Sequence, residues 1–120
     1  MLYAVQGSGA YVAHCPAGGS WDTLRTLVGS GGQRPRVMKH SNGTYLACYQ
    51  HRSGGGQYDY DIFYRTSNDL VTWAPEGRLT SNLNSHDAFC AQVGTQYVVY
   101  YGKAIGSIYY LFRTSSMDAE

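Results

Sequence analysis

Residues 43–49 read Gly-Thr-Tyr-Leu-Ala-Cys-Tyr, and residues 94–101 read Gly-Thr-Gln-Tyr-Val-Val-Tyr-Tyr. The Gly-Thr pair returns 51 residues further along the chain, and each copy is followed by two tyrosines that stand four residues apart. A second motif, Arg65-Thr66-Ser67, returns after 48 residues as Arg113-Thr114-Ser115, which predicts that Arg65 and Arg113 occupy equivalent third-strand positions and have a structural role. A period near fifty residues, filled with short alternating segments rather than helical ones, is typical of a propeller blade. We therefore predict an all-β, β-propeller-like fold.

The repeat divides the chain into about two and a half four-stranded antiparallel blades. Blade two is complete over residues 33–80, whereas blade one is partial over 1–29 and blade three is partial over 86–115. The predicted strands are 2–6, 10–14 and 21–28 in blade one, 35–39, 44–50, 60–66 and 72–79 in blade two, and 88–93, 97–101 and 108–113 in blade three.

Composition narrows the class of protein. The 120 residues suit one small domain, with 15 glycines and 12 tyrosines against three phenylalanines,. A net charge of +1 gives no electrostatic reason to expect nucleic acid or a membrane surface as a partner,. No apolar run approaches the ~20 residues of a membrane span and the first residues lack a secretory signal, so we expect a soluble chain whose compartment is not indicated.

Cysteines and histidines carry no metal-site spacing. Cys15, Cys48 and Cys90 stand far apart, with neither the CxxC spacing of a zinc site nor the even count of a disulfide framework,. The four histidines form no HxH or HxxxH pair. We interpret the cysteines as small buried strand residues and expect neither a metal nor another cofactor.

Two partial blades would leave sheet edges and apolar faces uncovered. Closed propellers carry ~4 to 8 blades. We therefore expect two copies of the chain to associate head to tail and close a ring of five or six blades. The expected partner is thus the chain itself, in a homodimer. Such a heterologous contact closes only if the rotation per blade is right. The alternative is that the chain is a fragment of a longer protein.

Residues 65–73, which read Arg-Thr-Ser-Asn-Asp-Leu-Val-Thr-Trp, resemble an Asp-box. The pattern of that motif is Ser-x-Asp-x-Gly-x-Thr-Trp, and Leu70-Val71 stands where glycine is usual. The resemblance implies a structural and not a catalytic role, in which the carboxylate accepts hydrogen bonds from the backbone of its own turn and the tryptophan packs between neighbouring sheets. The residues that fill the motif are Ser67, Asp69, Thr72 and Trp73.

Two further stretches are similar to glycoside hydrolase propellers. Arg34-Pro35-Arg36-Val37, followed by Asn42-Gly43-Thr44, resembles the opening of sialidase blades. That resemblance implies that Arg34 helps to bind a substrate carboxylate. His86-Asp87 with the strand that follows looks like a blade of the five-bladed arabinanase-type enzymes, which makes Asp87 a candidate catalytic residue. Together these resemblances cover most of residues 33 to 115.

Topology places a site without reference to any family. Alternate loops of an antiparallel blade emerge on opposite faces, and the first strands line the central channel. Arginine offers a rigid fork of donors for a carboxylate or a pair of sugar hydroxyls. The predicted ligand-binding residues are Arg34, Arg36, Arg52, Asp59, His86 and Asp87, with Asp61 farther out on the same face. The alternatives are that Arg34 simply pairs with Asp87 across adjacent blades, and that Asp59 and Asp61 form an exposed strand entrance.

Three functions stay open at this stage. We prefer a non-catalytic, carbohydrate-binding propeller, in which tyrosines stack on a glycan and the arginines hydrogen-bond its hydroxyls. The second is a glycoside hydrolase of the sialidase or arabinanase type, which needs two carboxylates at ~5 to 9.5 Å or a tyrosine activated by a glutamate. Asp87 with Asp59 or Asp61 is the conceivable pair, whereas Glu76 is expected on the opposite half of the blade. The third is a protein-interaction scaffold without a small ligand.

Overall fold

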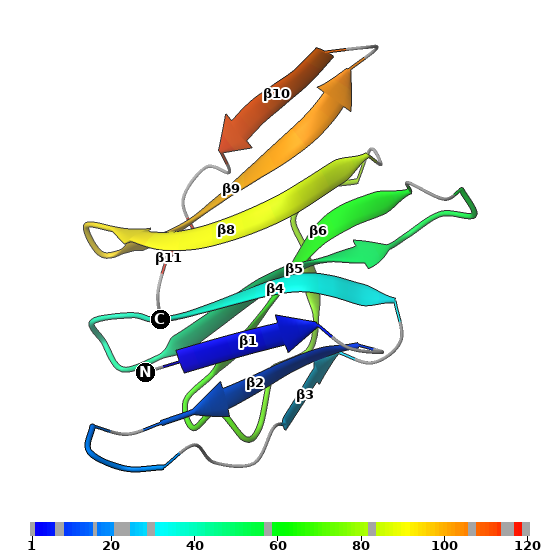
Figure 1. Cartoon of the computed structure of the whole chain (residues 1–120). Helices are drawn as coiled ribbons and strands as arrows, with labels where there is room; N and C mark the ends of the chain where they lie inside the picture. The colour runs from blue at the N-terminus through cyan, green and yellow to red at the C-terminus, as the bar shows by residue number, and fades with distance from the viewer. Residues whose placement is uncertain are drawn as a thin grey trace.

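The computed structural model describes residues 2–6, 9–15, 17–20, 25–28, 31–56, 59–81, 84–105, 108–113 and 117–118. These residues form strands and no helix, in three antiparallel sheets that follow one another along the chain (Figure 1). The all-β prediction is confirmed. The described residues close no ring.

Each sheet is built from consecutive strands. The first sheet contains β1 (Leu2–Gln6), β2 (Ala10–His14) and β3 (Arg25–Val28). The second contains β4 (Gly32–Lys39), β5 (Tyr45–Arg52), β6 (Tyr60–Ser67) and β7 (Gly77–Arg78). The third contains β8 (Ser85–Val93), β9 (Gln96–Ile105), β10 (Ile108–Arg113) and β11 (Met117–Asp118), in which β8 pairs along one edge of β9 and β10 and β11 pair along the other.

One predicted strand is much shorter than expected. Residues 72–79 were predicted as the fourth strand of the second sheet, but only Gly77–Arg78 pairs with β6 as a ladder. Pro75 has no N–H to donate, and residues 67–72 are held in a turn of their own. The predicted strand at 21–28 is present as β3 from Arg25, and its first part lies outside the described residues.

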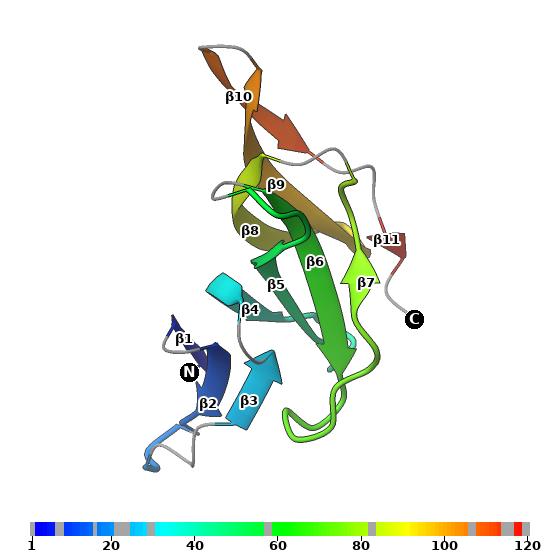
Figure 2. The ribbon, with the colours of Figure 1, turned by 90° about the vertical axis from the view of Figure 1, so that its right-hand side faces the viewer.

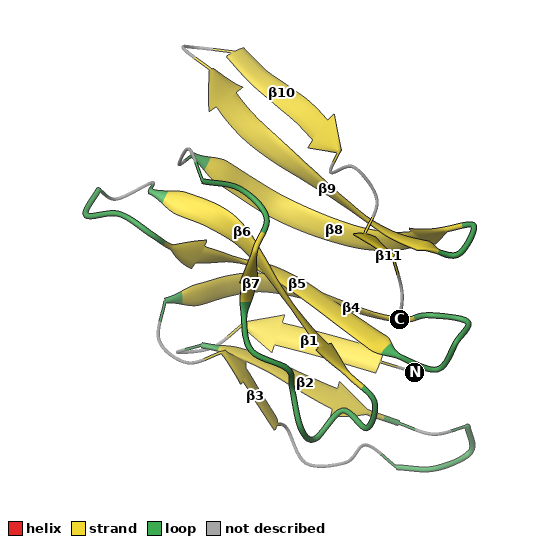
Figure 3. Cartoon of the chain, turned by 180° about the vertical axis from the view of Figure 1, so that it is seen from behind, coloured by secondary structure: helices red, strands yellow, loops and turns green. Residues whose placement is uncertain are grey.

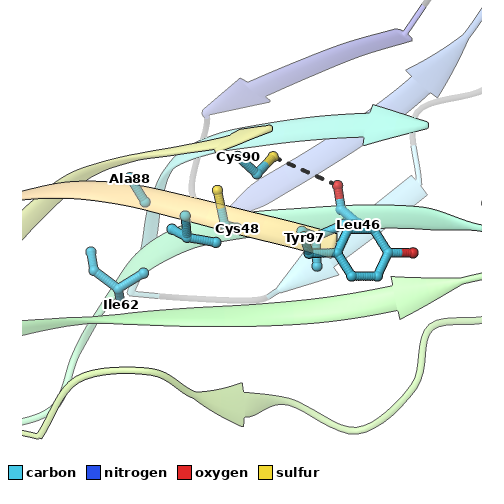
Figure 4. Packing of buried hydrophobic residues seen from close by; sticks show 7 residues of the cluster. Leu46, Cys48, Ile62, Ala88, Cys90 and Tyr97 are labelled. Atoms are coloured by element: carbon cyan, nitrogen blue, oxygen red, sulfur yellow. Dashed lines mark hydrogen bonds between the residues drawn. The ribbon is translucent and has the colours of Figure 1, made fainter. Parts of the chain in front are cut away.

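The second sheet lies between the other two, as Figure 2 shows, because both of its faces are apolar. β4 contacts β1 and β2 of the first sheet, and β8 contacts β4, β5 and β6 of the second. Ala47 and Tyr49 of β5 pack with Ala10, Leu27 and Val28 of the first sheet. Alternate residues of β5 therefore face opposite sheets, which explains why residues 46–50 are buried without a break,. The other core cluster, drawn in Figure 4, contains Leu46, Cys48, Ile62, Ala88, Cys90, Tyr97 and Val99.

Two of the three cysteines lie in this second cluster. Cys48 and Cys90 are buried, Cys15 is half-buried, and none of the three takes part in a disulfide. A hydrogen bond with Cys90, reinforced by burial, raises the pKa of Cys48. Cys90 Sγ lies 3.9 Å from the Leu46 carbonyl oxygen (Figure 4). The interpretation of the cysteines as small buried strand residues is confirmed for Cys48 and Cys90, and it was wrong for Cys15, which is half-buried and follows the end of β2.

The strand register shows which residues are equivalent in the second and third sheets. Tyr45 pairs with Lys39 and Tyr97 pairs with Gln92, so the tyrosines of the two repeats match. The Gly94-Thr95 hairpin is one residue shorter than its counterpart.

The two arginines of the Arg-Thr-Ser repeat are not equivalent. Arg65 pairs with Ala47, but Arg113 pairs with Tyr100, whose counterpart in β5 is Cys48. The prediction that Arg65 and Arg113 occupy the same position was therefore wrong. Arg113 stands one place away and faces the other side of its sheet, because the loop before β10 is shorter than the loop before β6,.

Candidate functional site

A β-bulge interrupts β4 close to its start. Gln33 pairs with Gln50 of β5 and the next regular pair joins Arg36 to Cys48, so β4 has one more residue than β5 over this step. The extra residue is accommodated at Arg34, whose φ of 51° lies in the left-handed region. A left-handed conformation costs a residue with a side chain about 1–2 kcal/mol. Such strained positions cluster at functional sites.

β8 repeats this bulge at the equivalent place. His86 pairs with Gly102 of β9 and Phe89 pairs with Tyr100, and Asp87 is left-handed with a φ of 57°. Each left-handed residue comes directly after the last pair before the bulge, on adjacent sheets. The sequence did not indicate either bulge, because neither position is the glycine that normally marks this conformation.

The two bulges bring a guanidinium and a carboxylate together. Arg34 Nη1 donates a hydrogen bond to Asp87 Oδ1, and each side chain is 54% exposed. This is the pairing across adjacent repeats that the sequence left open as an alternative. An exposed ion pair contributes only about 0–1 kcal/mol to stability. A ligand that offers its own acceptor to Arg34 or its own donor to Asp87 can therefore compete with the pair.

His86 extends this cluster toward the second sheet. The centroid of the His86 ring lies 5.6 Å from the centroid of the Tyr60 ring. The Arg52 guanidinium carbon lies over the same Tyr60 ring, 5.6 Å from its centroid. Burial lowers the pKa of His86, while the Asp87 carboxylate opposes this shift and the Arg34 guanidinium adds to it. Four of the predicted ligand-binding residues, Arg34, Arg52, His86 and Asp87, thus lie together, and we call them the rim.

The other two predicted ligand-binding residues make local contacts. Arg36 is exposed and donates from Nη1 to the neighbouring Pro35 carbonyl oxygen at 3.1 Å. Asp59 accepts the Gly56 N–H at 2.5 Å, and the Ser53 N–H binds the Asp59 carbonyl oxygen at 2.8 Å. Asp59 therefore shapes the loop between β5 and β6.

Asp61 is not on the exposed face where the sequence placed it. Its side chain is fully buried and accepts hydrogen bonds at 2.6 Å from Ser53 Oγ, Thr80 Oγ1 and Arg78 Nη2. Burial alone would raise the pKa of this carboxyl group, but the three donors outweigh burial and lower it. The prediction that Asp61 is an exposed carboxylate was wrong. A substrate cannot reach it, so it cannot act as an acid or base beside Asp87.

The turn that resembles an Asp-box is held by its own side chains. Asp69 Oδ1 accepts the N–H groups of Val71 at 2.9 Å and Thr72 at 2.8 Å, and the Thr72 bond is the largest cause of the lowered pKa of Asp69. The predicted bonds from carboxylate to turn backbone are confirmed. Leu70 is left-handed with a φ of 63° and is buried. Trp73 packs against the cluster between the first and second sheets.

An open groove of about 500 Å³ lies beside this turn. Its lining residues are Thr44, Thr66, Ser67, Asn68, Asp69, Thr72, Trp73, Ala74 and Pro75. None of the rim residues is among them, so the groove and the rim are separate features.

Ser67 is the residue of this turn whose loss should matter most. It is buried, its Oγ accepts the N–H of Leu70 at 2.9 Å, and its hydroxyl donates to the Thr72 carbonyl oxygen at 2.7 Å. We expect Ser67→Ala to lower the free energy of unfolding by about 1–3 kcal/mol, because these backbone groups lose their partner. Urea denaturation measures this, with Ser81→Ala at an exposed serine as the matched control. Equal stabilities of the two variants would contradict the expectation.

One polar cluster between the first and second sheets was not predicted from the sequence. Tyr49 Oη donates to Glu76 Oε2 at 2.5 Å, and His51 Nδ1 lies 3.3 Å from the same oxygen. Burial, followed by the hydrogen bond to Glu76, raises the pKa of Tyr49. A tyrosine beside a glutamate is the pair that a sialidase needs, but the Tyr49 side chain is fully buried, which prevents attack on a substrate. The sequence signal available for this cluster was the pair of tyrosines, Tyr45 and Tyr49, that stand four residues apart in β5.

Within the described residues, no three or more of His, Cys, Asp and Glu come together as a possible metal site. The described part of the chain also has no helix with the length and apolar character needed to cross a membrane. No known protein family, curated protein or solved structure matches this chain.

Proposed function

We propose that this chain is a carbohydrate-binding segment of a β-propeller, and that the glycan binds at the rim. The propeller part of the proposal is supported by the repeated way in which the sheets pack. The first strand of each following sheet packs on the sheet before it, as β8 does on the second sheet and β4 on the first. β1 runs in the direction of β5 and opposite to β4 (Figure 1), which fits a strand in the second position of its blade.

The observation that carries the proposed function is the pair of left-handed bulges. Bulges are frequent beside binding sites, where they aim a side chain that a regular strand would place elsewhere. Here they hold Arg34 and Asp87 together on an exposed surface, although each conformation is strained,. A guanidinium beside a carboxylate offers donors and acceptors to neighbouring hydroxyl groups, which is the pattern that a sugar ring presents.

Binding is favoured over hydrolysis by the positions of the other carboxylates. Asp87 is the exposed acid of the rim, whereas Asp61 is fully buried. The Asp59 carboxylate already accepts the Gly56 N–H. A second carboxylate positioned across a scissile bond from Asp87 is therefore missing among the described rim residues, and we propose Asp87 as a ligand-binding residue.

A glycan array followed by titration calorimetry tests the proposal. Arg34→Met and Asp87→Asn should each weaken binding of the selected glycan by roughly 10- to 100-fold, because each removes charge-assisted hydrogen bonds. Asparagine tolerates the left-handed conformation, so Asp87→Asn removes the charge and leaves the bulge intact. Arg113→Met, at an exposed arginine of β10 outside the rim, is the control and should bind normally. If no glycan binds, the proposed function is wrong and the scaffold alternative takes its place.

We also propose that a second copy of the chain covers the free face of the third sheet. Ile62 pairs with Gln50, and Leu111 pairs with Gly102 at the equivalent position of the third sheet. Ile62 is fully buried by the sheet beyond it, whereas Leu111 is 78% exposed. Leu111 thus occupies a position that a neighbouring sheet covers elsewhere in this chain.

A further inference from the structure

The side chain of Gln50 makes hydrogen bonds to both bulges. Its side chain is buried, with 2% exposed, in the middle of the row that joins β4, β5 and β6. Its Oε1 accepts the backbone N–H of Asp87 at 3.0 Å, and its Nε2 donates to Gln33 Oε1 at 3.3 Å. One contact reaches the left-handed residue of β8, and the other reaches the residue that precedes Arg34 in β4.

The bond to Asp87 answers a specific need of the bulge. A bulged residue loses its regular place in the hydrogen-bonded ladder, and a buried N–H without a partner is costly. The Asp87 N–H finds its acceptor across the interface between two sheets, in a side chain of β5. The left-handed backbone of Asp87 is therefore fixed by the second sheet and not by its own strand alone.

The side-chain amide supplies both contacts, because it has a donor and an acceptor. An ionised carboxylate accepts but does not donate, and the thioether of a methionine has no donor and is only a weak acceptor. The residue equivalent to Gln50 in the third sheet is Gly102, which pairs with His86 as Gln50 pairs with Gln33. The buried amide is therefore not a general feature of the repeat. It occurs where the Arg34 and Asp87 bulges face each other.

We infer that Gln50 is a positioning residue for the rim. By holding the Asp87 backbone and the Gln33 side chain at once, it sets the two bulges so that Arg34 and Asp87 meet. Its effect on glycan binding rests on the proposed function, whereas its effect on the Arg34 and Asp87 geometry does not depend on any ligand.

Two variants of the whole chain test this inference. Gln50→Met keeps the length of the side chain and removes both contacts, whereas Gln50→Glu keeps the acceptor for the Asp87 N–H. Hydrogen exchange of the ligand-free protein, followed by NMR, measures the exchange rate of the Asp87 backbone amide directly. In Gln50→Met the Asp87 amide should exchange about tenfold faster relative to the Val99 amide of the core, and Gln50→Glu should restore part of the protection.

A double-mutant cycle with Arg34→Met and Asp87→Asn gives the second measurement. The coupling between the two residues should be detectable in the wild type and absent in the Gln50→Met background. Should Gln50→Met fail to fold, Gln50→Glu and Gln33→Met both still remove the contact between residues 33 and 50 while keeping the acceptor for the Asp87 N–H. The coupling between Arg34 and Asp87 should then be smaller than in the wild type in both variants, and an unchanged coupling in both would overturn the positioning role.

The outcomes separate the inference from the proposed function. An unchanged Asp87 amide and an unchanged coupling would overturn the positioning role, whatever the glycan array shows. Faster exchange of the Asp87 amide, with glycan binding weakened about tenfold in Gln50→Met, supports both. Faster exchange in a protein that binds no glycan supports the positioning role and rejects the proposed function.

Discussion

Replacing Arg78 by methionine should lower the free energy of unfolding at neutral pH by about 3 kcal/mol, because it leaves the buried Asp61 carboxylate without its cation. Arg78 Nη2 lies 2.6 Å from Asp61 Oδ2, and Arg78 Nε donates to the Thr80 carbonyl oxygen. The guanidinium therefore ties β7 to β6, the two strands that Figure 3 shows from behind. The expected loss in the free energy of unfolding is taken from the lower end of the range for buried ion pairs, because the Arg78 side chain is 43% exposed,.

The pH dependence of this variant should be weaker than that of the wild type. In the wild type the folded-state pKa of Asp61 lies below its ordinary value of 3.8. Its stabilisation is therefore present above that value and is lost as the pH falls through the folded-state pKa. Without Arg78, the hydrogen bond and the positive charge of the guanidinium no longer lower the pKa of Asp61, so its folded-state pKa rises,. The variant has less of this stabilisation to lose, so its stability should fall less steeply than that of the wild type on acidification from about pH 7.

Urea denaturation at about pH 7 and about pH 4 measures both effects. Arg36→Met is the matched control, since Arg36 is exposed and, among the residues that the structure describes, donates to the adjacent Pro35 carbonyl oxygen. It should change stability by no more than about 0.5 kcal/mol. If Arg78→Met loses stability on acidification as steeply as the wild type, Asp61 is not the group that Arg78 stabilises.

The equivalent residues Ile62 and Leu111 should respond very differently to truncation. Ile62→Ala should cost about 2–5 kcal/mol, because it opens a cavity in the cluster between the second and third sheets,. Leu111→Ala should change stability by no more than about 0.5 kcal/mol in dilute protein, since its side chain is 78% exposed,. Urea denaturation of both variants at micromolar concentration makes the comparison.

Substitution of Leu111 also tests whether a second copy of the chain covers the third sheet. If a further sheet covers Leu111 in solution, Leu111→Lys should convert a concentration-dependent dimer into a monomer, which sedimentation equilibrium measures. Ile105→Lys, at another exposed apolar residue of the third sheet, is the control for a general loss of apolar surface. A wild-type chain that remains monomeric at every concentration would show that the proposed homodimer is wrong.

The strands could be predicted because their signals are local. Alternating residues and the turns at Gly43 and Gly94, both of which have a positive φ, mark the hairpins of the second and third sheets,. The turn at Asp69 was predictable for the same reason, since its donors lie two and three residues away. The repeat did not predict the register in which the strands pair. A shorter loop between two strands changes which residues face which sheet, and the shorter loop before β10 is why Arg65 and Arg113 were wrongly matched.

The candidate site was predictable only in part. The sequence brought Arg34 and Asp87 to the same face because the first strands of both repeats begin there. It could not show that both are left-handed, since neither residue is the glycine that normally marks this conformation. Contacts over long separations, such as Gln50 with Asp87 and Asp61 with Arg78, depend on how two strands pack and left no trace in local pattern. Asp61 was misplaced for this reason.

The loop around Asp59 offers a position for a chemical label. A β-carbon added at Gly54 or Gly56 would come within 2.6 or 2.7 Å of the Asp59 carboxylate, whereas one added at Gly55 would meet nothing within 4 Å. With Cys15 replaced by serine, Gly55→Cys would provide an exposed thiol for a fluorophore in the loop that follows Arg52. Such a dye would stand near the rim without entering any packed surface, and its emission would report occupancy in real time.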